Sequence, residues 1–575
     1  SGAYALSINR KAQSDIRSAQ SLHVAADLAS GEIDFPAAEV DAAYEAMALF
    51  DEHTWGAANP WETGLEHTES GDLQWHRKAN FAHVASETTG TLLDVGLHRL
   101  AAKFSPAKDA LASLLVFNPV GFERDALSRV FLPAERVPLD SSFRLIDPSS
   151  GDEIPYALEE QPFPHFRAIG QWIVFTAPRL PSLGYARFDL VAGAPASPAK
   201  ESALSHALES PFYTVEIDPI GGFITSIVDK ESGRELVDAS AAHGFNEYIY
   251  DRYTSAPTFN HLSGRVEALD FSLLGERSMG RYATVIERES NPVVDQIKLR
   301  IVVTGAEWLE STITLPKQTK QILIENRLMK IGTLEKESVY FAFPFAVDDP
   351  DPEYAITGGV TSLDAPHVPG SVQHMLAIRD WVGLQDGQGS VAWATVDAPL
   401  IELQNIAIPY APFPNSIPGD QPRRATIYSW ALNNIWDTNF PPQQRGELVF
   451  RYVVGSSSSQ ERRELGIRTA AAGTAAPIGI CLRAGDEPVL PQRTSLLSVS
   501  DPLVEIIHLE SGDETGAIRA LLLSLASEAV TIKLSGAAGE PAKAGTFLGE
   551  RMEPVVGGRL TLQPGDYVSV KLVPI

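Results

Sequence analysis

Four histidines fall close together within residues 53–83 and are the residues most able to do chemistry: His53, His67, His76 and His83. Imidazole is the commonest metal ligand and titrates near neutral pH, so the cluster favours metal binding or proton transfer. Arg77 and Lys78 directly follow His76, which is typical of a solvated helix face. The cluster has no His-Glu-x-x-His pattern and no cysteine pair. A hydrogen-bonded helix end or a surface position therefore remains the alternative for each histidine.

The setting of His53 favours a functional role most strongly. His53 follows Leu49 and Phe50 by four and three residues, so a helix continued through it would project the ring from the face packed into the protein. A buried imidazole needs a partner, which a carbonyl, a carboxylate or a metal ion would supply. Trp55 and Trp61 lie nearby, and their rings either support a sugar or pack a loop onto a helix.

Helices must position these residues. Apolar residues recur at steps of three and four through residues 8–26 and predict an amphipathic helix that ends at Gly31. A second helix is expected to begin near Pro36 and to carry the first histidine of the cluster at its end. A third helix is expected to begin at a cap formed by Asp72. Three helices with short connections predict a bundle over residues 1–110.

Beyond residue 105 the sequence changes to short β-branched runs broken by Gly, Pro and Asp, which predicts antiparallel strands and hairpins. The expected fold class is α+β, with an N-terminal three-helix bundle followed by several antiparallel β-sandwich domains. Stretches rich in Pro, Ala, Gly and Ser suggest the boundaries between them. The expected β domains are a small sandwich at 111–195, a large sandwich at 204–455 and a C-terminal β domain at 470–575.

The composition excludes several classes of protein. The 46 Lys and Arg residues face 73 Asp and Glu residues, a net charge of −27, so the chain would repel a nucleic-acid backbone. No apolar run reaches the length of about 18 residues that a membrane span needs. The single cysteine, Cys481, cannot form an intramolecular disulfide and is expected to be a buried apolar residue. A chain without disulfides favours a cytoplasmic location.

A set of motifs runs along the chain in a fixed order, beginning within the predicted bundle: Phe50-Asp51-Glu52-His53-Thr54-Trp55-Gly56, Gln74-Trp75-x-x-Lys78, Phe117-Asn118-Pro119, Asp218-x-x-Gly221-Gly222-x-Ile224-x-Ser226-Ile227-x-Asp229 and Asn433-Asn434-x-Trp436-x-Thr438-Asn439. Together with the bundle, these motifs resemble glycoside hydrolase family 38, the α-mannosidases, over nearly all of the 575 residues. The resemblance is to the middle helical and C-terminal β domains, and a bacterial origin is expected.

The resemblance implies a retaining α-mannosidase in which a divalent metal ion, usually zinc, holds hydroxyls of the mannose being cleaved. In that family an N-terminal (β/α) domain supplies the catalytic carboxylates and three of the four metal ligands, and the helical domain supplies a last histidine. That position matches His53. The sequence begins where the catalytic domain should end, so we expect Zn²⁺ or another divalent cation to be completed by ligands outside this chain. We also expect these residues alone to be inactive.

The resemblance also implies contacts to the sugar. Many eukaryotic members carry Asp directly after the ligand histidine, where this chain has Thr54, and related enzymes place a tyrosine from a comparable β-strand at the sugar. The candidate substrate-binding residues are Thr54, Trp55, Tyr248, Tyr250, Asn434 and Trp436. Asparagine is equally common in turns and tryptophan in cores. The expected partners are a mannose-containing oligosaccharide and the missing catalytic domain, and homo-oligomerisation is left open.

A second interpretation comes from a different class of function. The β-rich architecture alone also permits a non-catalytic carbohydrate-binding or scaffolding assembly. The two interpretations differ at His53, because a binding module has no need of a histidine directed toward an interface with a catalytic domain.

Overall fold

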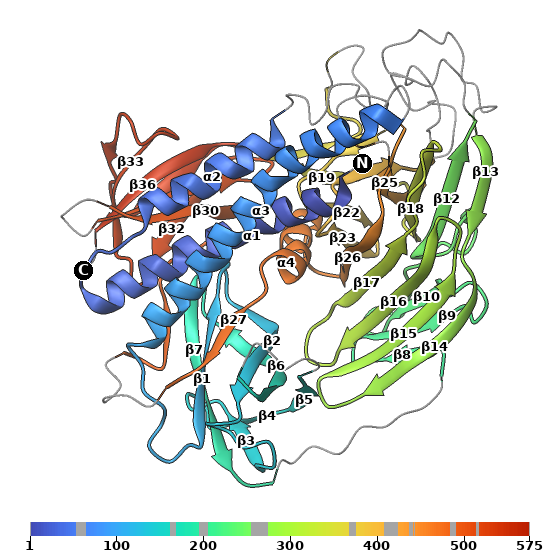
Figure 1. Ribbon diagram of the computed structural model, residues 1–575. Helices are drawn as coiled ribbons and strands as arrows, with labels where there is room; N and C mark the ends of the chain where they lie inside the picture. Colours follow the sequence, from blue (N-terminus) through green and yellow to red (C-terminus); the bar gives the residue numbers. More distant parts are fainter. Residues whose placement is uncertain are drawn as a thin grey trace.

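The computed structural model describes residues 2–52, 65–161, 168–194, 205–254, 274–366, 368, 375–406, 424–435, 441, 443–483, 490–512 and 517–573, with the backbone alone at 65–70. Long helices run along one side of a body made of β-sheets (Figure 1). Among these residues no helix is long and apolar enough to cross a membrane. The predicted fold class, a three-helix bundle followed by antiparallel β-sandwiches, is confirmed.

The bundle consists of α1 (Ala3–Ser30), α2 (Ala37–Asp51) and α3 (Leu65–Ala101). Its interior is the apolar face predicted for the first helix, where Ile16 and Ala19 pack against Val40 and Leu92. Gly31 ends α1 in a left-handed conformation, φ 71°, which glycine adopts without strain. The predicted start of the third helix is wrong. Asp72 lies on an exposed face inside α3, where an aspartate is tolerated and packing against α1 decides the helix.

A small sandwich follows the bundle. One sheet has the order β27 (Ile478–Cys481), β1 (Ala112–Asn118), β7 (Gly184–Ala192), β3 (Phe143–Ile146) and β4 (Glu153–Ile154), with β28 (Arg493–Ser495) also paired to β7. The other has the order β2 (Arg124–Pro133), β6 (Gly170–Leu180) and β5 (Tyr156–Glu160). Their facing side chains form one apolar core, which includes Cys481, buried as predicted.

Three sheets share the largest core. The first has the order β14 (Arg281–Ser290), β15 (Val294–Val302), β16 (Ala306–Pro316), β17 (Ile322–Lys330), β26 (Gly446–Ser457), β23 (Gly389–Thr395), β22 (Trp381–Asp386), β19 (Glu353–Ile356) and β20 (Gly359–Ser362). The second has the order β13 (Leu274–Met279), β12 (Glu247–Tyr253), β18 (Glu337–Phe345), β25 (Ala425–Asn433), β24 (Leu400–Leu403) and β21 (Met375–Ala377). The third has the order β11 (Arg234–Glu235), β10 (Ile224–Asp229), β9 (Tyr213–Ile217) and β8 (Ala207–Glu209).

The C-terminal part contributes one helix and two further sheets. Helix α4 (Arg462–Thr474) begins at Glu461, whose side chain accepts a hydrogen bond from the Arg463 N–H. One sheet has the order β30 (Val504–Ser511), β31 (Ile518–Ser524), β36 (Tyr567–Val573), β33 (Glu540–Gly545) and β34 (Glu553–Pro554), and the other β29 (Ser498–Val499), β32 (Val530–Ser535) and β35 (Arg559–Leu562). β27 and β28 belong to the C-terminal part of the chain and pair with β1 and β7 of the small sandwich, so the two parts share one sheet. The domain limits expected from the sequence stay predictions.

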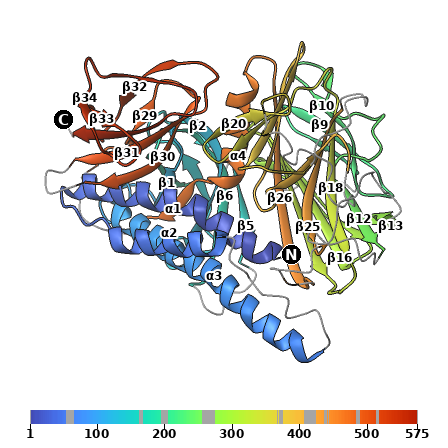
Figure 2. The ribbon, with the colours of Figure 1, turned by 90° about the horizontal axis from the view of Figure 1, so that it is seen from above.

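Helix α1 lies between the other two helices and the β-sheets (Figure 2). From Ser18 to Asp27 every one of its residues is buried. Its N-terminal turns reach the ends of β25 and β26, and its middle faces β30 and α4. Most of the contact between the bundle and the rest of the molecule therefore passes through this one helix.

Candidate functional site

The end of α2, which leads to His53, is held firmly by its two neighbouring helices. The Asp51 carboxylate accepts hydrogen bonds from the side-chain amides of Asn9 (2.9 Å) and Gln13 (2.6 Å) on α1. Lys78 of α3 donates to the carbonyl oxygens of Leu49 (2.7 Å) and Glu52 (3.0 Å). A cation at this position also interacts favourably with the C-terminal end of the helix dipole. The backbone immediately before residue 53 is thus fixed on the bundle.

The first turns of α1 join this end of the bundle to the large β domain. The Ala3 N–H donates to the Gln444 side chain (2.7 Å), and the Gln444 amide donates to the Asn433 carbonyl (3.3 Å). One turn further on, the Ser7 hydroxyl donates to the carboxylate of Asp397 (2.7 Å). We call this region the bundle corner, defined by Asn9, Asp51, Lys78, Gln444, Asn434 and Glu337.

Glu337 lies beside Asn434, which accepts its backbone N–H, on the β side of the bundle corner. Its carboxylate is 2.7 Å from the Lys330 ammonium, and both side chains are at most 1% exposed. The Tyr250 phenol interacts with the same carboxylate. Burial raises the pKa of Glu337 above its ordinary value, and the Lys330 charge only partly opposes this shift. The pair is enclosed by protein, so its Coulomb attraction offsets a large desolvation cost.

The two candidate tyrosines lie on β12 and are both buried, at 3% and 5% exposed. The Tyr248 hydroxyl donates to the Thr304 carbonyl oxygen at 2.7 Å, whereas the Tyr250 hydroxyl meets Glu337. Burial raises the pKa of both phenols, so both are neutral donors at physiological pH. The turn at Gly305, φ 83°, packs against the Tyr250 ring so closely that a side chain there would collide with it.

Asn434 joins the same group from the end of β25. Its side-chain oxygen accepts the Glu337 N–H (2.8 Å), and its amide donates to the carbonyls of Thr333 (3.1 Å) and Glu335 (2.9 Å). Asn434 therefore connects the end of β25 to the turn before β18 by hydrogen bonds. Of the candidate residues in the described chain, Tyr250 and Asn434 meet at Glu337, and Tyr248 lies one side chain away on the same face of β12.

The other candidates, His53, Thr54, Trp55 and Trp436, lie outside the described residues. Two members of the histidine cluster, His76 and His83, are described and are exposed on α3. Across the residues that the structure describes, no group of three or more His, Cys, Asp or Glu side chains is placed to hold a metal ion. These residues alone do not supply the ligand set of a zinc site.

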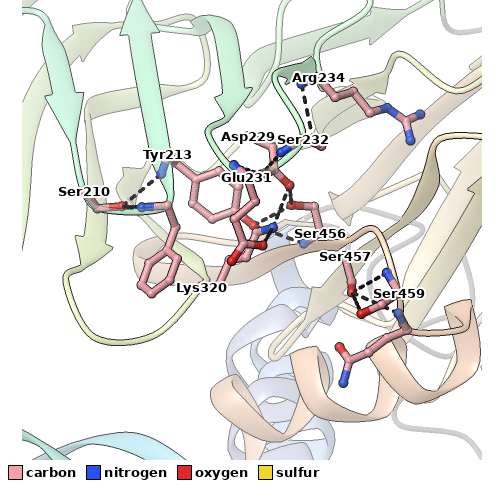
Figure 3. A network of polar contacts seen from close by, with 12 residues as sticks. Ser210, Tyr213, Asp229, Glu231, Ser232, Arg234, Lys320, Ser456, Ser457 and Ser459 are labelled. Carbon is pink, nitrogen blue, oxygen red and sulfur yellow. Dashed lines mark hydrogen bonds and ion pairs between the residues drawn. The ribbon is translucent and has the colours of Figure 1, made fainter.

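A second polar group, which the sequence did not single out as a site, lies in the large β domain. The Asp229 carboxylate accepts the Ser456 hydroxyl (2.6 Å) and is 2.8 Å from the Lys320 ammonium. Ser456 and the buried Tyr213 hydroxyl are 2.8 Å apart (Figure 3). Hydrogen bonds from Ser456 and Lys320 hold the pKa of Asp229 below its ordinary value although burial opposes them. The group joins β9, β10, β26 and the turn between β16 and β17, which is a folding role.

Sequence reasoning missed Glu337 and Lys330. The available signal was a glutamate directly before the apolar run of β18 and a lysine at the end of the alternating strand β17. Charged residues at strand ends are usually solvated, so pattern alone gives no reason to pair these two.

Comparison with known proteins finds a family match within the large β domain. Residues 208–395 match the glycosyl hydrolases family 38 C-terminal domain. A comparison with curated protein sequences gives no match. Two solved structures from Enterococcus faecalis have a similar fold. One is described as an alpha-mannosidase, with 14% identity, a TM-score of 0.69, and coverage of 99% of this chain and 67% of that chain. The other is described as a protein in glycosyl hydrolase family 38, with 14% identity, a TM-score of 0.72, and coverage of 99% and 70%.

Proposed function

We propose that this chain forms the helical and β part of a retaining, metal-dependent α-mannosidase, and the match of residues 208–395 to the glycosyl hydrolases family 38 C-terminal domain supports this. The substrate class is a mannose-containing oligosaccharide or glycan, cleaved at an α-mannosidic bond. The carboxylates that cleave the bond, and the remaining metal ligands, belong in this proposal to a catalytic domain outside the 575 residues. The protein works in the cytoplasm of a bacterium.

The observation that carries the proposal is the placement of the bundle corner. The end of α2 is fixed by Asn9 and Lys78 as far as Glu52, the residue that precedes His53 in the sequence. The first turns of α1 bring the β domain to the same end through Gln444. A histidine that completes a metal site from another domain needs such a fixed origin, because its ligand geometry tolerates little movement.

Within this proposal His53 is the ligand contributed by this chain, and Thr54, Trp55, Tyr248, Tyr250, Asn434 and Trp436 are the candidate sugar contacts. A bound divalent cation would hold sugar hydroxyls. The residues that the structure describes act by positioning other groups. The Glu337 carboxylate interacts with the neutral Tyr250 phenol, and Asn434 fixes the backbone at the end of β25. Of the two tyrosines we favour Tyr250, because it shares Glu337 with Asn434.

The test uses this chain joined to the catalytic domain that the proposal requires. His53→Ala should lower bound zinc by about one equivalent and abolish hydrolysis of a 4-nitrophenyl α-mannoside, since a catalytic zinc site keeps only three or four protein ligands. His83→Ala, an exposed histidine of the same bundle, is the matched control and should change neither quantity. Unchanged zinc content in His53→Ala would contradict the ligand role.

The non-catalytic interpretation is tested on the 575-residue chain alone. The proposal expects no turnover and no metal-dependent mannose binding by this chain. Binding of a mannoside to the isolated chain, insensitive to a chelator and unaffected by His53→Ala, would favour a carbohydrate-binding assembly instead.

A further inference from the structure

A cavity of about 160 Å³ lies where the middle of α1 meets β30, α4 and the turn after β1. Figures 1 and 2 show α1 beside both β30 and α4. A cavity of about 150 Å³ is large enough to hold a benzene molecule, so this one has room for a compact organic ring or a short chain.

The two walls of the cavity differ in chemistry. Polar residues of α1 recur at steps of three and four and so lie on one helix face: Arg10, Gln13, Ser14, Arg17, Ser18 and Ser21. The opposite wall is largely apolar and includes Ile467 and Ala470 of α4 and Val504 and Ile506 of β30. A polar helix face turned toward an apolar wall suits a ligand with one polar end and one apolar end.

The carboxylates that line the cavity are already engaged by protein groups. The Glu505 carboxylate receives two hydrogen bonds from Arg379, at 2.7 and 2.9 Å, and Asp380 lies 3.1 Å from the same guanidinium. The Asp501 carboxylate accepts the Leu503 N–H at 2.9 Å. Arg379 is consequently shared by two acids and has no capacity to spare for a further anion.

Two other arginines lack a carboxylate in hydrogen-bonding contact. Arg10 donates to the carbonyl oxygens of Val396 (3.0 Å) and Arg379 (2.6 Å), and burial lowers its pKa. The Arg17 guanidinium makes no hydrogen bond or ion pair with any part of the chain that the structure describes, and Arg17 is exposed, so the cavity opens to solvent on its side. Ser18 is 5% exposed, and its hydroxyl likewise has no hydrogen bond within the described chain.

We propose that this cavity binds a small monocarboxylate whose apolar body is about the size of a benzene ring. The carboxylate pairs with Arg17 and accepts the Ser18 hydroxyl, while the body packs against the apolar wall formed with α4 and β30. Guanidinium matches a carboxylate bidentately. A dianion such as phosphate is disfavoured, because Glu505 stands on the same rim and the lining holds no second unengaged guanidinium in the open part.

Benzoate is the probe, and its binding to the 575-residue protein can be measured by saturation-transfer NMR and calorimetry. Arg17→Gln should weaken benzoate binding by about tenfold, the loss expected for one charge-assisted contact. Arg559→Gln, an exposed arginine of β35 that does not line the cavity, is the matched control and should leave binding unchanged. Benzyl alcohol, which has the ring without the charge, should bind more weakly than benzoate, and inorganic phosphate should not compete.

The volume requirement has its own variant. Ala470→Leu places a larger side chain in the cavity and should abolish benzoate binding while Arg17 is retained. If that variant fails to fold, Arg17→Gln decides alone, because its side chain is exposed. Equal affinity of Arg17→Gln and wild type for benzoate would overturn the proposal. So would competition by phosphate, or the absence of benzoate binding at millimolar concentration.

Discussion

Helix α1 borders two regions that contain similar side chains and use them differently. At the bundle corner, several polar groups bond to other protein groups, although Oδ1 of Asn9 is buried without a hydrogen-bond partner in the described chain. Asp51 accepts from Asn9 and Gln13, and Asn434 accepts the Glu337 N–H. At the cavity, Arg17 and Ser18 of the same helix have no such partner in the described chain. The first region is built to hold a fixed shape, and the second retains binding capacity.

The largest expected effect is at the corner. Lys330→Met leaves Glu337 as a buried, unpaired carboxylate, which should lower the free energy of unfolding by about 3–5 kcal/mol at neutral pH. Burial already raises the pKa of Glu337 in the folded protein. The protonated side chain therefore stabilises the fold fully below the unfolded pKa of 4.5, and this stabilisation is lost as the pH rises through the folded pKa. The penalty should therefore shrink as the pH is lowered. Urea unfolding at several pH values measures both effects.

Lys298→Met is the matched control. Lys298 pairs with Glu310 at 2.8 Å, but its side chain is 31% exposed and Arg300 also pairs with Glu310. The expected cost is below about 1 kcal/mol. Equal losses for the two lysine variants would contradict the view that the corner is tightly enclosed.

Asn434→Ala should have the next largest effect. It leaves the Glu337 N–H and two carbonyl oxygens without the partner they have now, so the free energy of unfolding should fall by about 1–3 kcal/mol. Asn80→Ala, on the exposed face of α3, should change it by less than about 0.5 kcal/mol. A small effect at Asn434 would show that water replaces its hydrogen bonds easily.

Substituting two serines of α1, one in each region, allows the two regions to be compared directly. Ser7→Ala removes a hydrogen bond to Asp397 and should cost about 1 kcal/mol. Ser18→Ala removes a buried hydroxyl that bonds to nothing in the described chain, so it should change stability by less than about 0.5 kcal/mol. Thermal and urea unfolding measure both. A larger cost at Ser18 would contradict an unengaged hydroxyl at the cavity.

The smallest effect on the free energy of unfolding is expected for Glu505 at the cavity, once the pH is acidic. Burial opposes ionisation of Glu505, but the charge and hydrogen bonds of Arg379 outweigh it and lower the pKa. Its stabilisation is therefore present above the unfolded value of 4.5 and is lost as pH falls through the folded value. The unfolding free energies of wild type and Glu505→Gln should converge on acidification. Glu540→Gln, exposed on β33, is the control.

Much of the fold could be predicted from the sequence, because the spacing of apolar residues indicates which face of a helix or strand is buried. The first helix, its end at Gly31 and the change to β structure beyond residue 105 follow from local patterns. Helix α4 was missed, although Glu461 and an alanine-rich run mark it, because four serines before it suggested only a boundary. Asp72 was mistaken for a cap because capping residues also occur on exposed helix faces.

The site could be predicted only in part. Tyr250 and Asn434 were named from a resemblance, and the structure brings them together at Glu337, but no spacing in the sequence pairs Glu337 with Lys330. Other motif residues serve the fold. Asn118 donates to the Phe122 and Pro181 carbonyls, and Asp218 accepts the N–H of Ile220 in the turn at Gly222. Residues of such a motif can therefore stabilise the fold as readily as they take part in chemistry.

The pairing of β1 with β27 sets an order for events on the ribosome. Leu114 lies opposite Cys481 in that pair, and β28, with Arg493 opposite Ala186, extends the same sheet. The small sandwich consequently stays unfinished until almost the whole polypeptide has been synthesised. Until then the open side of β1 is a template for other nascent chains, so premature termination before residue 478 should yield aggregates rather than a soluble shorter product.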